Sequence, residues 1–152
     1  MSLEVGQMAP DFEAKIETGA SIKLSDYRGK KVILYFYPKD DTPGCTAQAC
    51  NLRDNYSALL KKGFAVVGVS TDAVKTHKKF ETKYELPFPL IADEDKKIVE
   101  QYGVWGEKKF MGKTYMGITR TTFLIDEAGK IIKIIEKPDT KNHTEEILAA
   151  LK

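Results

Sequence analysis

Two short runs of apolar residues constrain the fold of this chain most tightly. Val32–Tyr37 and Ala65–Ser70 are apolar at successive positions, so both faces of each strand must be buried. Each run is followed by a segment with helical spacing of its apolar residues, Cys45–Lys62 and Ala73–Tyr84. Buried strands that alternate with helices favour a sheet covered on both faces. We therefore expect an α/β protein with a mixed central sheet sandwiched by helices.

The other predicted elements are short. Phe12–Ile16 and Ser21–Leu24 form an N-terminal β-hairpin in this interpretation. Gly103–Gly117 has no clear periodicity, and we interpret it as a loop that folds back and packs its own aromatic side chains. Further strands are predicted at Pro89–Ala92, Thr121–Ile125 and Lys130–Glu136, the last two as a hairpin, and further helices at Lys96–Tyr102 and Thr144–Leu151.

Length and charge exclude several classes of protein. A chain of 152 residues corresponds to one domain, predicted over residues 1–152. With 24 Lys and Arg against 22 Asp and Glu, the net charge of +2 gives no basic surplus for binding nucleic acid. No signal peptide is visible at the start, and the longest apolar run is far shorter than the roughly 20 residues that span a bilayer. We expect no membrane association and a cytoplasmic location.

The most informative segment leads into the helix that contains both cysteines, Cys45 and Cys50. Thr42 and Pro43 are typical of a helix start, because Thr can cap free amides and Pro needs no N–H there. This places Cys45 in the first helical turn, where free N–H groups and the helix dipole favour an anion. A thiol at that position loses its proton more readily, and the thiolate is the nucleophilic form. The sequence therefore predicts a reactive cysteine at position 45.

Cys50 follows five residues later. On an unbroken helix the two Cα atoms would be about 9 Å apart, whereas bridged cysteines need about 4.4–6.8 Å. A disulfide between them therefore requires local unwinding of the helix. The alternative interpretation is that Cys50 is a buried helix residue without chemistry.

Other uses of these residue types are weaker. Two cysteines make no structural disulfide framework, and with two scattered histidines they lack the spacing of a zinc site. His77 is interpreted as a residue at the edge of the core and His143 as one at a helix start. Gly106–Thr114 resembles a phosphate-binding loop, but five residues separate its glycines where the motif has four, and no strand leads in and no helix leads out.

The pattern Pro38-x3-Thr42-x2-Cys45 resembles the active-site signature of the peroxiredoxins, in particular their bacterioferritin comigratory protein/PrxQ branch. Further similarity lies at Gly6–Phe12, Leu24–Gly29 and Arg120–Asp126, so the resemblance extends over essentially the whole chain. It implies a thioredoxin-like fold and reduction of hydrogen peroxide or alkyl hydroperoxides without a metal or flavin cofactor.

The resemblance also implies roles for individual residues. Cys45 would be the peroxidatic cysteine, which attacks the peroxide and becomes a sulfenic acid. Arg120 would supply the stabilising cation, Thr42 its hydroxyl group, and Pro38 a wall that shields the pocket from water. Cys50 would be the resolving cysteine, which forms an intramolecular disulfide with Cys45. A thioredoxin-like dithiol would then reduce that disulfide, and the protein would be a monomer or weak homodimer.

Two alternative functions remain open on the residues alone. A thioredoxin-type disulfide reductase is disfavoured, since the cysteines are not Cys-x-x-Cys and Ile118-Thr119 contains no proline before the late strand. A peroxide-sensing or binding module with little turnover would use Gly103–Gly117 as a docking surface.

Overall fold

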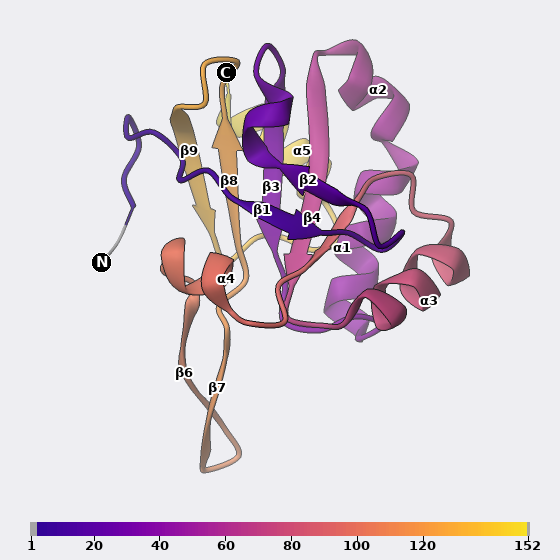
Figure 1. Ribbon diagram of the computed structural model, residues 1–152, viewed down its shortest axis with the longest axis vertical. Helices are drawn as coiled ribbons and strands as arrows, with labels where there is room; N and C mark the ends of the chain where they lie inside the picture. The colour runs from indigo at the N-terminus through magenta and orange to yellow at the C-terminus, as the bar shows by residue number, and fades with distance from the viewer. Residues whose placement is uncertain (1–2, 152) are drawn as a thin grey trace.

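A mixed five-stranded sheet forms the centre of the molecule. The computed structural model describes residues 3–151, so the ends of the predicted domain (1, 2 and 152) lie outside the described residues. The strand order is β5-β4-β3-β8-β9; β3, β4 and β5 are parallel, and β8 and β9 are antiparallel to their neighbours. Figure 1 shows the sheet near the middle of the chain's fold. The five strands are β3 (Lys31–Phe36), β4 (Phe64–Ser70), β5 (Leu90–Ala92), β8 (Thr121–Ile125) and β9 (Ile131–Glu136).

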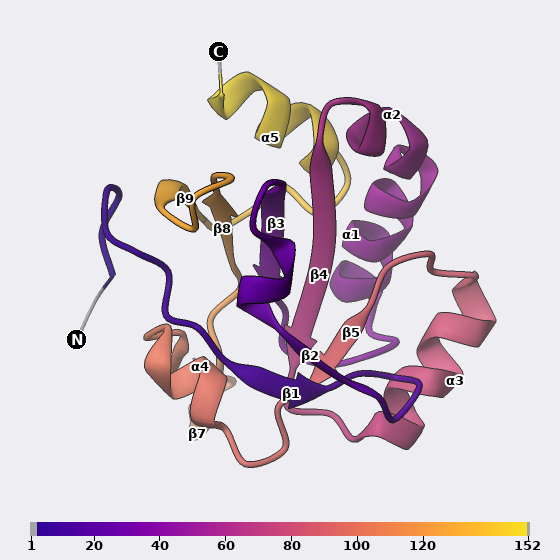
Figure 2. The same ribbon diagram turned by 45° about the horizontal axis from the view of Figure 1, so that its top comes forward.

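The alternating residues of β3 divide the core into two parts. Ile33 and Tyr35 pack toward the helical face, which consists of α1 (Pro43–Asp54), α2 (Tyr56–Lys61), α3 (Val74–Tyr84) and α5 (His143–Ala150). Val32, Leu34 and Phe36 pack toward the opposite face. That face is covered by α4 (Lys97–Gln101), the 3-10 helix Leu24–Tyr27 and the hairpin of β1 (Glu13–Lys15) and β2 (Ser21–Lys23), as Figure 2 shows. The predicted mixed sheet and N-terminal β-hairpin are thus confirmed, although one face is covered partly by that hairpin.

The predicted helix over Cys45–Lys62 is wrong in one respect, because Asn55 divides it into α1 and α2. The side-chain amide of Asn55 donates a hydrogen bond to the carbonyl of Asn51, 2.8 Å away. Asn side chains that bond to nearby backbone groups compete with the regular helix pattern. The apolar spacing continues through the break, so the periodicity alone does not reveal it.

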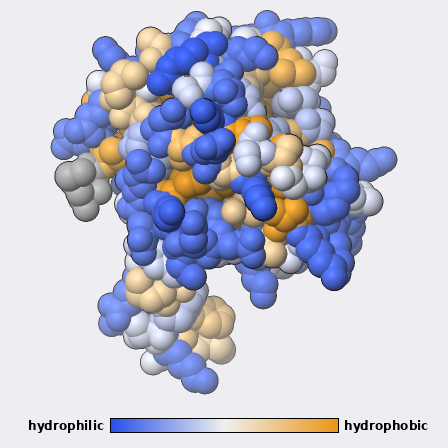
Figure 3. All heavy atoms as spheres, viewed as in Figure 1, coloured by the Kyte–Doolittle hydropathy of each residue, from blue (hydrophilic) through white to orange (hydrophobic). Residues whose placement is uncertain are grey.

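The interpretation of Gly103–Gly117 as a loop that buries its aromatic side chains is also wrong. The segment forms a separate antiparallel hairpin of β6 (Trp105–Phe110) and β7 (Lys113–Ile118). The hairpin projects from the body of the molecule (Figure 1), and Figure 3 shows apolar atoms on its surface. Strands are recognised in a sequence when apolar residues on one face are buried. Most residues of this hairpin are exposed on both faces, so its sequence signal is weak.

The expectation that no strand leads into the glycine pattern of Gly106–Thr114 is wrong. That pattern lies on two antiparallel strands and their turn, so a strand does lead in, but no helix follows it. A phosphate-binding loop needs a helix N-terminus directly after the glycines.

No helix among residues 3–151 is long and apolar enough to cross a membrane.

Candidate active site

The first turn of α1 places Cys45 at the end of the sheet. Thr42 is the N-cap residue, Pro43 the first helical residue and Cys45 the third, as predicted. The capping interaction itself is not present, because the Thr42 hydroxyl donates to the Lys39 carbonyl at 3.0 Å instead of accepting from a helix amide. Thr42 thus fixes the turn before the helix rather than the free amides inside it.

A guanidinium group lies against the sulfur of Cys45. The Nη2 atom of Arg120 is 3.3 Å from Cys45 Sγ. Gly44 makes room for this contact, since a Cβ atom at that position would lie only 3.0 Å from Arg120 Nη2. The Cys45 residue is 1% exposed, so the cation and the sulfur meet in a largely water-excluded environment. A cation in such surroundings stabilises negative charge on sulfur more strongly than it would in water.

The register of the sheet explains why Arg120 reaches Cys45. β8 pairs antiparallel with β3, with Thr121 opposite Phe36. The start of β8 therefore meets the end of β3, from which the chain runs through Pro38 to Cys45. The structure thus places Arg120 beside Cys45, as its expected role as a cation requires. Pro38 itself is half-buried and follows the core residue Tyr37, which lies directly after the end of β3.

Gln48 also belongs to this site, although it was not among the predicted site residues. Its Oε1 atom accepts a hydrogen bond of 2.7 Å from Arg120 Nη1, so one guanidinium spans Gln48 and Cys45. Gln48 is completely buried, and its Nε2 atom has no hydrogen-bond partner within the described part of the chain. The available signal was its spacing: residues three apart on a helix share a face.

Cys50 is positioned differently. It is half-buried in the middle of α1, and neither thiol is in a disulfide. The helix is continuous from Cys45 to Cys50, so the geometric obstacle to a disulfide that the sequence predicted is present. A bond between the two sulfurs requires part of α1 to unwind.

The loop before α1 is attached to α3 through a buried ion pair. The ring of His77 is 2.6 Å from Asp40 through Nδ1, and its Nε2 atom is 2.8 Å from the Ile91 carbonyl. Both ring nitrogens thus face acceptors, as in a protonated imidazole. Burial opposes charge on His77, but the hydrogen bond and the charge of Asp40 outweigh it and raise the pKa of His77. His77 is therefore fully buried and paired, not at the core edge as expected.

Further contacts complete this attachment. The Tyr37 hydroxyl donates to Asp40 at 2.6 Å, and the Asp40 amide donates to Asp72. The neighbouring residue Asp41 accepts hydrogen bonds from Lys83 and Tyr84 of α3, which lower the pKa of Asp41. Asp40 and Asp41 were not among the predicted site residues. Their signal was the unusual Asp-Asp pair just before the helix start.

Three residues of this attachment, Asp40, Asp72 and His77, offer possible metal ligands but no open site. Ligand atoms of Asp40, Asp72 and His77 lie within 4.8 Å of one another. Each is already used in a hydrogen bond: the imidazole nitrogens as above, and Asp72 with Ser70 at 2.6 Å. The residues fit a hydrogen-bonded cluster better than a metal-binding site, which would need free lone pairs.

The second histidine, His143, begins α5 as predicted and is buried. Burial lowers the pKa of His143, whereas the hydrogen bond that its ring makes to the Glu146 carboxylate acts in the opposite direction. Its other ring nitrogen is 2.9 Å from the Thr122 hydroxyl. These contacts join α5 to β8 and do not bring His143 to either cysteine.

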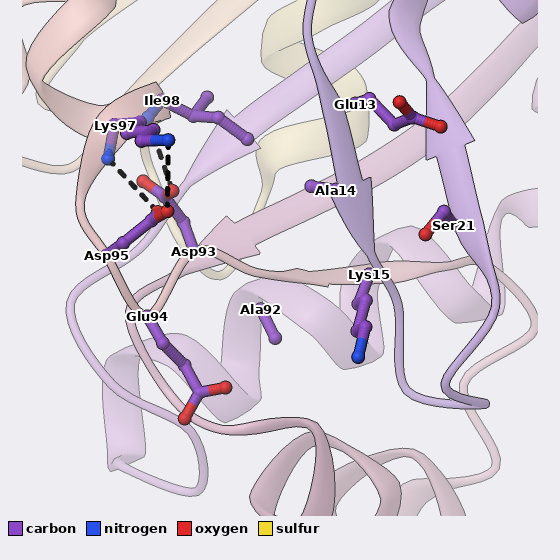
Figure 4. A pocket seen from close by; sticks show the side chains of 10 residues that line it. All are labelled: Glu13, Ala14, Lys15, Ser21, Ala92, Asp93, Glu94, Asp95, Lys97 and Ile98. Atoms are coloured by element: carbon purple, nitrogen blue, oxygen red, sulfur yellow. Dashed lines mark hydrogen bonds and ion pairs between the residues drawn. The ribbon is translucent and has the colours of Figure 1, made fainter.

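A cavity of about 450 Å³ lies elsewhere, between the N-terminal hairpin and the residues that follow β5. Figure 4 shows its lining, which contains neither cysteine. Asp93 accepts hydrogen bonds from the amides of Ile98 and Val99, so its carboxylate serves the start of α4. Burial raises the pKa of Asp93. We assign this cavity no part in the chemistry of Cys45.

Comparison with known proteins supports the family resemblance. The model of the AhpC/TSA family matches residues 5–134. The chain is 49% identical to Peroxiredoxin Bcp of Bacillus subtilis over 152 residues, which is 100% of this chain and 97% of the relative. It is also 49% identical to Peroxiredoxin Bcp of Escherichia coli, over 99% of this chain and 96% of that protein.

Solved structures agree with this comparison. A mutant of Xylella fastidiosa PrxQ superposes with a TM-score of 0.92 and 30% identity, over 99% of this chain and 96% of that chain. The bacterioferritin comigratory protein of Xanthomonas campestris, studied for its alkyl peroxide reduction activity, gives a TM-score of 0.89 at 32% identity, over 97% of both chains. The expected thioredoxin-like fold is thereby confirmed.

Proposed function

Because the chain belongs to the AhpC/TSA family and, with its Bcp and PrxQ relatives, is a thiol-dependent peroxidase, we propose that Cys45 is its peroxidatic residue. The observation that carries this assignment is the 3.3 Å contact between Arg120 Nη2 and Cys45 Sγ in the first turn of α1. No hydrogen bond or salt bridge joins the Cys50 thiol to any residue in 3–151, and the guanidinium of nearby Arg53 is paired with Asp54 instead.

The first chemical step follows from these positions. The Cys45 thiolate attacks one oxygen of the hydroperoxide, the O–O bond breaks, and the other oxygen leaves as alkoxide or hydroxide and takes up a proton. Sulfur is oxidised to a sulfenic acid, and the peroxide is reduced to alcohol or water. Arg120 stabilises the charge that moves from sulfur to the leaving oxygen. Thr42 provides a hydroxyl beside the helix start, and Pro38 lines the same loop.

Resolution by Cys50 requires the helix to open. The Cys50 thiol attacks the Cys45 sulfenic sulfur, an S–S bond forms, and the sulfenic oxygen leaves as water. Because Cys45 is 1% exposed and α1 is continuous, unwinding of its first turn serves two purposes. It exposes the Cys45 sulfur to reactants and allows the two cysteines to come close enough for a disulfide. A thioredoxin-like dithiol then exchanges with the disulfide and returns both thiols.

A coupled assay tests this proposal. We expect hydrogen peroxide and an alkyl hydroperoxide to be consumed with NADPH, thioredoxin reductase and thioredoxin, and activity to disappear in Cys45→Ser. We expect Cys50→Ser to reduce one equivalent of peroxide and then stop as a sulfenic acid. Continued thioredoxin-dependent cycling of Cys50→Ser would remove Cys50 from the mechanism, and activity of Cys45→Ser would overturn the assignment of Cys45.

A further inference from the structure

The β6–β7 hairpin concentrates exposed apolar side chains near one end of the molecule. Seven large apolar residues are exposed among residues 3–151, and four of them lie on this hairpin. Only the base of the hairpin packs against the core. A two-stranded hairpin is only marginally stable in water where it packs against nothing, so the projection of its outer part needs a reason beyond folding. The four are Phe110 (66% exposed), Met111 (87%), Tyr115 (47%) and Met116 (54%).

The turn residue Met111 is unfavourable for both conformation and solvation. Met111 and Gly112 form the two-residue connection, and both have positive φ, of 52° and 78°. Such hairpin turns strongly favour Asn-Gly, because Asn tolerates the left-handed conformation. Neither the turn nor water favours methionine here. A flexible, polarisable methionine is instead well suited to contact with a partner surface.

The base of the hairpin is fixed although its tip is free. Trp105 packs against the core, with Lys96 5.5 Å from the centre of its ring. Thr119 donates a backbone hydrogen bond to Val104, and Lys108 Nζ donates to the Ile118 carbonyl. These contacts hold the hairpin in one orientation, which reduces the entropic cost of docking a partner.

The hairpin is continuous with the active site. β7 ends at Ile118, and Arg120, two residues later, contacts Cys45 Sγ. In Figure 1 the hairpin projects from the end of the molecule at which β8 begins. A protein that reduces the oxidised cysteines must approach this end of the molecule, beside the hairpin.

Charge selects the class of partner. The hairpin carries Lys108, Lys109 and Lys113 but only one acidic residue, Glu107. A second copy of the chain would bring like charges together at this surface, which is unfavourable. Lysines on free strand edges also oppose edge-to-edge pairing between copies. The complementary surface is apolar with acidic residues around it.

We propose that the tip of the β6–β7 hairpin docks the dithiol protein that reduces the Cys45–Cys50 disulfide, through an apolar surface with an acidic rim. This inference rests on the proposed function, because it assumes a disulfide that a protein dithiol reduces. Met111 and Phe110 provide the apolar contact, and Lys109 and Lys113 provide the charge. The hairpin takes no part in the reaction of Cys45 with peroxide.

The first test is Met111→Asn, which restores the favoured Asn-Gly turn and so does not weaken the hairpin. We expect kcat/KM for a bacterial thioredoxin to fall about fivefold. Turnover with dithiothreitol and the rate constant of Cys45 with hydrogen peroxide should stay unchanged. Met8→Asn is the matched control, because Met8 is also exposed (54%) but precedes the N-terminal hairpin; it should leave all three quantities unchanged.

The second test is the double variant Lys109→Glu with Lys113→Glu. We expect kcat/KM for thioredoxin to fall about tenfold, with a weaker salt dependence than in the unmodified protein. Lys108 is left in place because it bonds to the base of the hairpin. Unchanged thioredoxin kinetics in both variants would overturn the proposal, and so would an equal loss with dithiothreitol.

Two further measurements distinguish other partners. Loss of self-association in Met111→Asn by sedimentation, with unchanged thioredoxin kinetics, would assign the hairpin to a second copy of the chain. Loss of binding to phosphatidylglycerol vesicles, with unchanged kinetics, would assign it to a membrane surface. Either result overturns the proposal. If the unmodified protein fails to consume peroxide even with dithiothreitol, the assignment of Cys45 fails; if it fails only with thioredoxin, that assignment stands, and the proposed recycling by thioredoxin and the docking proposal fail together.

Discussion

Cys45 and Cys50 lie five residues apart on one helix, yet α1 gives them different surroundings. Cys45 is in the first turn, almost fully buried and 3.3 Å from a guanidinium group. Cys50 is half-buried in the middle of the helix, and its thiol makes no hydrogen bond or ion pair to any described residue. From this contrast we expect Cys45 to be the more reactive thiol, because of its position on the helix and the cation supplied by a strand distant in sequence.

The largest effect should come from replacing each of the two cysteines by serine, one at a time. We expect Cys45→Ser to lower the rate constant for peroxide reduction by at least about 10³-fold, because the nucleophile is lost. Cys50→Ser should leave that rate constant unchanged in a single turnover. Stopped-flow measurement of peroxide consumption without reductant checks both. Similar losses in the two variants would remove the distinction between the thiols.

Removal of the cation should have the next largest effect. Arg120→Met keeps much of the side-chain length but no charge, and we expect about a 10²–10³-fold fall in the rate constant with peroxide. Alkylation of Cys45 at neutral pH should be slower in this variant than in the unmodified protein, because the cation beside its sulfur is lost, whereas alkylation of Cys50 should not change. Rates of iodoacetamide labelling, resolved by peptide, measure this. A parallel change at both cysteines would mean that Arg120 acts on the fold and not on Cys45.

Much of this arrangement was predictable, because it follows from local rules. The helix start at Thr42 and Pro43 and the position of Cys45 follow from backbone chemistry that a short segment contains. The meeting of Arg120 and Cys45 depends on the register between β3 and β8, which the family resemblance supplied and the residues alone did not.

The rest depends on contacts between segments distant in sequence. Asp40 and His77 are 37 residues apart, and nothing in the spacing indicates that they form a buried pair. Gln48 resembles any polar helix residue until Arg120 is placed beside it. The β6–β7 hairpin was missed because a projecting hairpin with two exposed faces lacks the burial pattern from which strands are recognised.

Gln48 provides a smaller test of the same comparison. We expect Gln48→Leu to slow the reaction of Cys45 with peroxide about tenfold, because Arg120 loses a charge-assisted hydrogen bond that orients it. Gln48→Glu keeps an acceptor for Arg120 and serves as the control, with a smaller loss expected. An equal loss in both variants, measured by stopped flow, would contradict a role in orienting the guanidinium group.

Disulfide formation should change α1, which contains both cysteines, more than it changes α2. We expect the oxidised protein to lose hydrogen-exchange protection at backbone amides between Cys45 and Cys50, since a wound helix holds their Cα atoms about 9 Å apart. The amides of α2 should change less. Exchange followed by mass spectrometry of reduced and oxidised protein gives the comparison, and identical protection in α1 would contradict the required unwinding.

The smallest effect concerns pH and the loop before Cys45. The pKa of His77 is raised in the folded protein, mainly because Asp40 outweighs burial. Its contribution to stability is therefore complete below the unfolded pKa of about 6.5 and is lost as the pH rises through the folded pKa. Urea unfolding across this range should show falling stability, and His77→Gln should show a flatter dependence. Equal slopes would contradict the charged Asp40–His77 pair.

Direct trapping of the oxidised sulfur tests the central claim. Each single-serine variant is treated with one equivalent of hydrogen peroxide in the presence of dimedone, and the labelled peptide is identified by mass spectrometry. We expect a sulfenic acid adduct on Cys45 in Cys50→Ser and no adduct in Cys45→Ser. An adduct on Cys50 in Cys45→Ser, formed as fast as the adduct on Cys45 in the other variant, would contradict it.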